Sequence, residues 1–129
     1  MNKILVEVSV GELLDKISIL EIKKEKIKDS DKLIFINDEY LVLTKQLNEN
    51  MDLNDELKKL YKELKAINAK LWDIEDNKRM CEKNSDFGEN FIKLSRDVHF
   101  LNDDRAKIKL AINNKTGSKI KEIKQYTNY

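Results

Sequence analysis

The chain has 129 residues, of which 38% are charged and 40% hydrophobic, with no proline and only three glycines, so it fits one helix-rich domain and lacks the turn residues of all-β folds. Twenty-five basic and twenty-four acidic side chains leave a formal charge of +1, which argues against a nucleic-acid-binding protein and an anionic membrane surface. The lone cysteine, Cys81, excludes an internal disulfide, and no apolar run reaches the roughly 20 residues of a membrane span, so we expect a cytoplasmic protein.

The first half of the chain predicts a strand followed by two helices. In residues 3–8, Ile4, Val6 and Val8 lie on one side of an alternating pattern, which is typical of a strand. Ser9 stands three residues before Glu12, the spacing of a capping box at the start of a helix. Apolar residues then recur in steps of three and four, which predicts helices over about 9–28 and 31–49.

The second half predicts two longer helices and a closing strand. The same three–four spacing continues over about 53–84 and 86–116, with Asp52 as a cap before the third helix. Asp86 stands three residues before Glu89 and should cap the fourth helix, and Gly117 is well placed to end it in the left-handed conformation. We expect residues 119–126 to form a strand that pairs with residues 3–8, because one strand alone is not stable.

These elements predict a mainly all-α fold. Apolar residues that repeat about every seven positions favour helices packed antiparallel, as in a coiled coil, in two hairpins of unequal length above a small two-stranded sheet. The longer hairpin should extend beyond the shorter one at its tip, residues 74–94, which still carries apolar side chains. We therefore expect a homodimer in which two tips pack on each other.

A candidate ligand site centres on Arg105, a cation at an apolar position of the fourth helix. A small anionic ligand that bears phosphate or carboxylate would suit this guanidinium, unless Arg105 pairs with Glu21 or Glu39 across the bundle. Trp72, the only tryptophan, is either a packing residue or the wall of a pocket. The remaining members of the candidate site lie beside these two on the third and fourth helices: Asn102, Lys109, Glu75 and Arg96, the last two as an expected ion pair.

The sequence evidence for an enzyme is weaker than that for a ligand site. His99 is the only histidine, and neither a zinc motif nor a glycine-rich phosphate loop occurs, so we predict no catalytic residue, metal or cofactor. One alternative remains in the spacings Glu12-x-x-Asp15 and Asp73-x-x-Asp76, which are similar to the magnesium-binding carboxylate pairs of all-α nucleotide pyrophosphatases.

Several stretches together resemble a known family. They are EVSVGELLDKISILEIK at 7–23, LWDIED at 71–76, DFGENFIKL at 86–94, LNDDRAKIKLAIN at 101–113 and the tail Lys124-Gln-Tyr126. The resemblance is to small bacterial and phage proteins classed as a domain of unknown function, and it spans nearly the whole chain. It implies an all-helical protein without an assigned activity. Members tend to carry Tyr where His99 stands here, and no catalytic residue can be carried over from them.

Three functions remain in order of preference. The first is a homodimeric structural or protein-interaction module, with a further protein partner open. The second is a binding domain for the small anionic ligand described above. The third is a magnesium-dependent enzyme of the pyrophosphatase kind.

Overall fold

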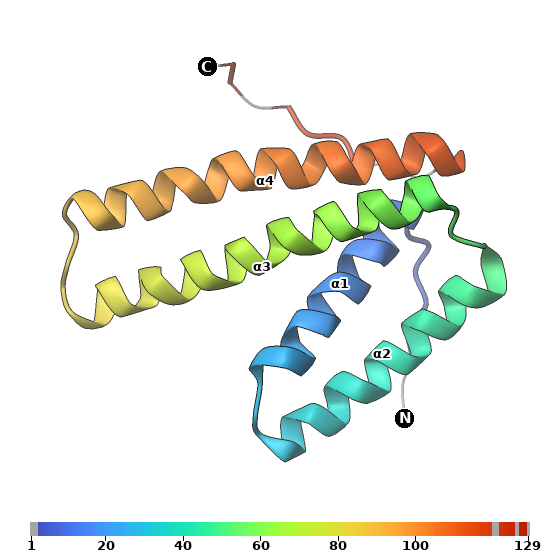
Figure 1. The fold of residues 1–129 in the computed structure, drawn as a ribbon, viewed down its shortest axis with the longest axis horizontal. Coiled ribbons are helices and arrows are strands. Elements are labelled where there is room, and N and C mark those ends of the chain that lie inside the picture. Colours follow the sequence, from blue (N-terminus) through green and yellow to red (C-terminus); the bar gives the residue numbers. More distant parts are fainter. Residues whose placement is uncertain (1–2, 120–121, 126, 129) are drawn as a thin grey trace.

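The computed structural model describes residues 3–119, 122–125 and 127–128 and contains four helices. They are α1 (Val10–Lys26), α2 (Ser30–Asn50), α3 (Asp55–Lys83) and α4 (Glu89–Thr116). Helices α3 and α4 form a long hairpin, and the shorter α1–α2 hairpin lies at an angle to it (Figure 1). Helix α1 lies close to each of the other three, whereas the backbone of α2 comes close to that of α1 alone. No helix in the described part of the chain has an apolar stretch that could span a bilayer.

The helix ends follow local sequence signals. The backbone N–H of Glu12 donates to Oγ of Ser9 at 3.1 Å, which confirms the expected cap of α1. Gly117 adopts φ +66°, which confirms it as the left-handed end of α4. The expected cap Asp52 is wrong, because Asn54 accepts from the backbone N–H of Leu57 at 2.8 Å and starts α3 two residues later. Helix α4 also begins later than expected, after Gly88 rather than Asp86.

Helix α1 is buried on two of its faces, which makes it the centre of the fold. One face carries the apolar side chains of the main core, and the other carries Gly11, Asp15, Ser18 and Ile22, all buried at steps of three and four residues. The main core joins all four helices through Leu14, Ile17, Leu47, Leu57, Leu64 and Ile112.

The expected two-stranded sheet is wrong for the residues that the structure describes. Residues 3–8 and 122–125 have no strand structure, while 120, 121 and 126 lie outside the described residues. Ile4, Leu5 and Val6 are at least 75% exposed, so their alternation covers no apolar surface. The two ends of the chain also leave the bundle on opposite sides (Figure 1). A two-stranded sheet without a packed face is only marginally stable, which explains why the alternation alone misled the prediction.

The two hairpins differ in length as the sequence predicts. Helices α3 and α4 have 29 and 28 residues, against 17 and 21 for α1 and α2. The α3–α4 tip therefore extends past the α1–α2 hairpin (Figure 1). At the tip Cys81 is buried, and Phe87 contacts Phe91 edge to face with their ring centroids 5.6 Å apart.

Gly11 allows α1 and α4 to approach closely. Its backbone N–H donates to Oδ1 of Asn113 at 2.7 Å, and both residues are buried. A Cβ at position 11 would lie 2.6 Å from the carbonyl oxygen of Lys109 and 2.9 Å from Oδ1 of Asn113. The first of these atoms belongs to the backbone of α4, so the two helices would have to move apart.

We therefore expect Gly11→Ala to lower the free energy of unfolding by about 1–3 kcal/mol, the usual cost of overpacking. Urea denaturation measures this change. Gly88→Ala is the matched control, because its nearest neighbour would be Oδ1 of Asp86 at 3.6 Å, an ordinary contact. Equal stabilities of the Gly11→Ala and Gly88→Ala variants would contradict the close approach of α1 and α4.

Candidate functional site

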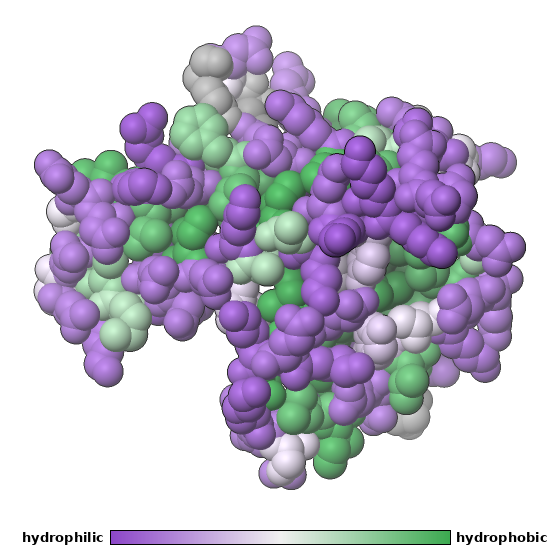
Figure 2. Space-filling model, in the orientation of Figure 1, coloured by the Kyte–Doolittle hydropathy of each residue, from purple (hydrophilic) through white to green (hydrophobic). Residues whose placement is uncertain are grey.

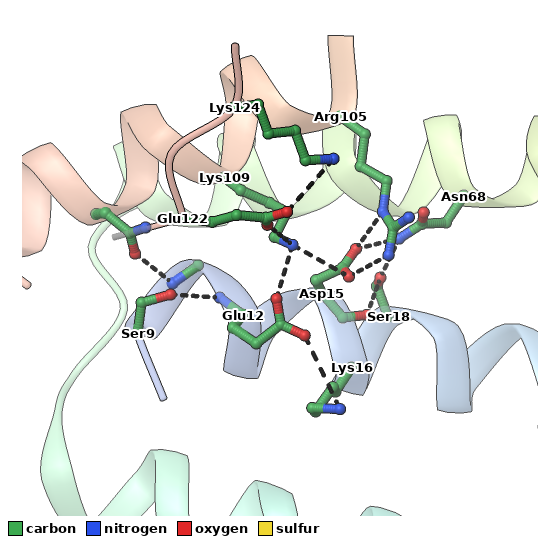
Figure 3. A network of polar contacts seen from close by, with 12 residues as sticks. Ser9, Glu12, Asp15, Lys16, Ser18, Asn68, Arg105, Lys109, Glu122 and Lys124 are labelled. Atoms are coloured by element: carbon green, nitrogen blue, oxygen red, sulfur yellow. Dashed lines mark hydrogen bonds and ion pairs between the residues drawn. The ribbon is translucent and has the colours of Figure 1, made fainter. Parts of the chain in front are cut away.

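A buried carboxylate, Asp15 of α1, joins three helices (Figure 3). Its side chain is 1% exposed. Arg105 of α4 binds it through two parallel hydrogen bonds, from Nε to Oδ1 at 2.9 Å and from Nη2 to Oδ2. Asn68 of α3 donates from Nδ2 to the same Oδ1 at 2.9 Å. Paired hydrogen bonds of this kind between Arg and a carboxylate fix geometry as well as charge.

Ser18 completes the polar contacts on this side of Asp15. Asn68 also donates from Nδ2 to Oγ of Ser18 at 2.8 Å, and that hydroxyl donates to the backbone carbonyl of Asp15 at 2.7 Å. Throughout the described residues, every buried side-chain nitrogen and oxygen has a hydrogen-bond partner. The cluster is therefore fully satisfied, which is the condition under which a buried polar network stabilises a unique packing.

Lys109, one turn beyond Arg105, connects the helices to the C-terminal tail (Figure 3). Its Nζ donates to Glu12 of α1 at 2.7 Å and to Glu122 of the tail at 2.8 Å, and Lys124 lies 3.4 Å from the same tail carboxylate. Burial opposes the charge of Lys109, but its hydrogen bonds to Glu12 and Glu122 outweigh this effect and raise the pKa of the ammonium group. The hydrogen bond from Lys109 in turn lowers the pKa of Glu122.

Arg105 is held by an ion pair, but with a different partner from the two that the sequence offers. The hydrogen bonds to Asp15 raise the pKa of the guanidinium against the effect of burial. Glu21 instead accepts hydrogen bonds from Tyr61 and from Lys65, the latter at 3.1 Å. Because Asp15 carries one full negative charge beside Arg105, the pair contributes almost no net charge to a ligand.

The candidate ligand residues divide between separate places. Trp72, Glu75 and Arg105 line one groove of about 320 Å³, in the angle between α1 and the outer half of α3. Lys109 lines a different, polar pocket of about 280 Å³ together with Glu12 and Glu122, and Arg105 borders both spaces.

The other two candidates, Arg96 and Asn102, lie on α4 away from the groove. Arg96 is exposed beside Phe100, 5.9 Å from the ring centroid, and forms no ion pair with Glu75 among the described residues. Asn102 is half-buried.

Three of the four carboxylates considered for magnesium are engaged with cations in the described part of the chain, and Asp76 is the exception. Glu12 and Asp15 bind Lys109 and Arg105, and Asp73 lies 3.5 Å from Nζ of Lys26. In the described ranges, no group of three or more His, Cys, Asp or Glu side chains is arranged to hold a metal ion.

The sequence reasoning missed the buried polar residues around Arg105. Asp15 was considered only as half of a metal pair, and Ser18 was not singled out. The sequence did contain a signal for this cluster. Gly11, Asp15, Ser18 and Ile22 form a second row along α1, on a different face from the apolar residues of the main core. Two small residues and one carboxylate in such a row indicate a close helix crossing that includes a buried cation.

The ion pair yields a stability prediction. Arg105→Met leaves the Asp15 carboxylate buried without its main cation, since Nζ of Lys109 is 3.9 Å away and replaces neither hydrogen bond. We expect the free energy of unfolding to fall by about 3–5 kcal/mol. Urea denaturation is the measurement, and Arg96→Met, at an exposed position of the same helix, should change it by less than about 0.5 kcal/mol. An unchanged Arg105→Met protein would contradict a charged, buried Asp15.

The tail contact yields a pH dependence. The folded pKa of Glu122 lies below its ordinary value of 4.5, so its contact with Lys109 stabilises the fold above that pH and is lost as pH falls through the lowered pKa. The melting temperature of Glu122→Gln should therefore be lower than that of the unaltered chain at neutral pH, and the difference should disappear as the pH falls below 4.5 and through the lowered pKa. A difference that persists in acid would exclude this titration.

Three of the five stretches that resemble a known family meet at this site. Residues 7–23 supply Asp15, 101–113 supply Arg105 and Lys109, and 71–76 supply Trp72. No curated protein and no solved structure matches the chain. A family model does match residues 4–129, nearly the full length. The chain therefore belongs to DUF6165, a family of unknown function.

Proposed function

We propose that this chain is a helical protein-interaction module that works as a homodimer paired through α2. The observation that carries the proposal is the outer face of α2, where Ile34, Phe35, Leu41 and Val42 are 59–76% exposed. Leu47 is the only buried residue of α2, whose backbone comes close to α1 alone, so no described helix covers this face. Figure 2 shows hydrophobic side chains at the surface in the lower part of the molecule, where the α1–α2 hairpin lies.

The size of this face supports pairing with a second copy. If each of the four side chains presents on the order of 100 Å², the row amounts to about 400 Å², as large as the largest apolar patches on ordinary monomers. Two such rows with their flanking polar residues would bury roughly 1,000 Å² in total, the lower limit for a specific interface.

Charge favours an antiparallel arrangement of the two copies. Asp31, Asp38 and Lys45 follow one another at intervals of seven residues along the middle of the same face. In a parallel pair, each of these charged residues would face the same residue of the other chain, so like charges would meet. In an antiparallel pair centred between Leu41 and Val42, Asp38 of one chain would lie opposite Lys45 of the other.

The tip of the α3–α4 hairpin is the other candidate interface. Met80, Phe87 and Ile92 are exposed there, which supports the expectation drawn from residues 74–94. However, Cys81 is buried and Phe91 and Leu94 are half-buried within the hairpin, so the two helices already cover much of the apolar row. We therefore favour α2 over the tip.

Light scattering at micromolar concentration tests both interfaces. The unaltered chain should have twice the 15.2 kDa mass of a single chain. Phe35→Glu combined with Leu41→Glu should give a folded monomer, because both residues are exposed and a carboxylate without a cation opposite it is costly to bury in the interface. The matched control is Phe87→Glu combined with Ile92→Glu at the tip, which should remain a dimer.

The opposite pattern, a monomer only after the tip substitutions, would reject α2 as the interface and favour the tip. A single-chain mass for the unaltered protein would reject the homodimer itself.

A further inference from the structure

The groove beside Trp72 is a second surface, independent of α2. Its walls are Ile19 and Ile22 of α1 and Leu71 and Trp72 of α3. At one end lie Asn68 and Arg105, and at the other the three charged residues Glu75, Asp76 and Arg79. Figure 2 shows the surface hollowed where the outer part of the α3–α4 hairpin leaves the α1–α2 hairpin. Its volume of about 320 Å³ lies at the small end of ligand pockets.

The inner end of the groove is rigid and nearly neutral. Asn68 is fixed by its hydrogen bonds to Asp15 and Ser18. Arg105 is fixed by two hydrogen bonds to Asp15, whose charge cancels its own. This end can hold a polar or apolar group in a defined place, but it does not attract an anion over a long range.

The outer end has an excess of negative charge. Glu75, Asp76 and Arg79 are exposed, and none of them forms an ion pair or hydrogen bond within the described ranges. Arg79 stands four residues after Glu75 and three after Asp76, so it can reach one of the two carboxylates along the helix. The second carboxylate then remains available at the mouth of the groove.

Trp72 adds an attraction for cations at the same place. The face of an indole ring carries negative electrostatic potential and binds ammonium and guanidinium groups more strongly than the other aromatic rings do. Trp72 stands three and four residues before Glu75 and Asp76, hence on the same side of α3. Apolar walls, an aromatic face and one surplus carboxylate therefore occur together in one groove.

We propose that this groove binds a small organic cation, a molecule with an apolar body and one ammonium or guanidinium group. The apolar body lies against Ile19, Ile22 and Leu71. The cationic group lies at the outer end, between the Trp72 ring and the carboxylates of Glu75 and Asp76. Arg105 alone would indicate an anionic ligand, but Asp15 neutralises its charge, so we propose a cationic ligand instead.

The experiment uses Trp72 as the probe, since the chain has no other tryptophan. Its fluorescence is followed while the full chain is titrated with 2-phenylethylamine and, separately, with phenylacetate at the same ionic strength. The two compounds have the same aromatic ring and opposite charges. We expect a saturable change with the amine and an affinity at least about fivefold higher than for the carboxylate.

Matched variants then locate the cationic group. Glu75→Gln combined with Asp76→Asn should reduce the affinity for the amine by about fivefold or more. Arg79→Gln, at an exposed position on the same rim, should leave the affinity unchanged or raise it. All three positions are exposed, and equal melting temperatures would show that the variants remain folded.

Three results would overturn the proposal. They are tighter binding of phenylacetate than of the amine, a linear rather than saturable response to the amine, and an unchanged affinity after Glu75 and Asp76 are neutralised. None of these results depends on whether the chain is a monomer or a dimer.

Discussion

The arrangement of the helices depends on one buried carboxylate. Asp15 accepts hydrogen bonds from α3 through Asn68 and from α4 through Arg105, so three helices share one charge. A buried carboxylate without a cation is very costly, and only a crossing that brings Arg105 to it is acceptable. The apolar core allows several ways of packing amphipathic helices, whereas the Asp15 contacts select one. Gly11 has the matching steric role, because its missing side chain lets α1 come close enough to α4 for these bonds to form.

Much of the fold could be predicted from the sequence because the helices are specified locally. The three–four spacing of apolar residues, the Ser9 cap and the Gly117 end each depend on residues within a few positions of one another. The prediction of two strands is wrong for a different reason. Alternation in residues 3–8 indicates a strand only if another part of the chain covers one side of it, and that is a tertiary property. The structure leaves Ile4 and its neighbours exposed.

The candidate site was only partly predictable for a related reason. Arg105 could be found from the sequence alone because a cation at an apolar position has to be neutralised or reach water. Its partner could not, because Asp15 is 90 residues away and several carboxylates on α1 and α2 were equally eligible. Trp72 and Glu75 share a helix face in the sequence, but their meeting with Ile19 and Ile22 depends on the angle between α1 and α3. The sequence alone suggests a positively charged groove, whereas in the structure the negative charge of Asp15 cancels the positive charge of Arg105.

The attachment of the tail differs physically from the packing of the helices. Glu122 and Lys124 are bound to the bundle through Lys109, while Ile123, between them, is 80% exposed. Contacts between apolar side chains are insensitive to ordinary salt, whereas salt partly screens the ion pair between the buried Lys109 and Glu122, whose side chain is 43% exposed. Salt therefore acts on the two parts of the chain unequally. A rise in electrolyte concentration weakens the attachment of the carboxyl-terminal segment to α4 more than it weakens the packing of the four helices.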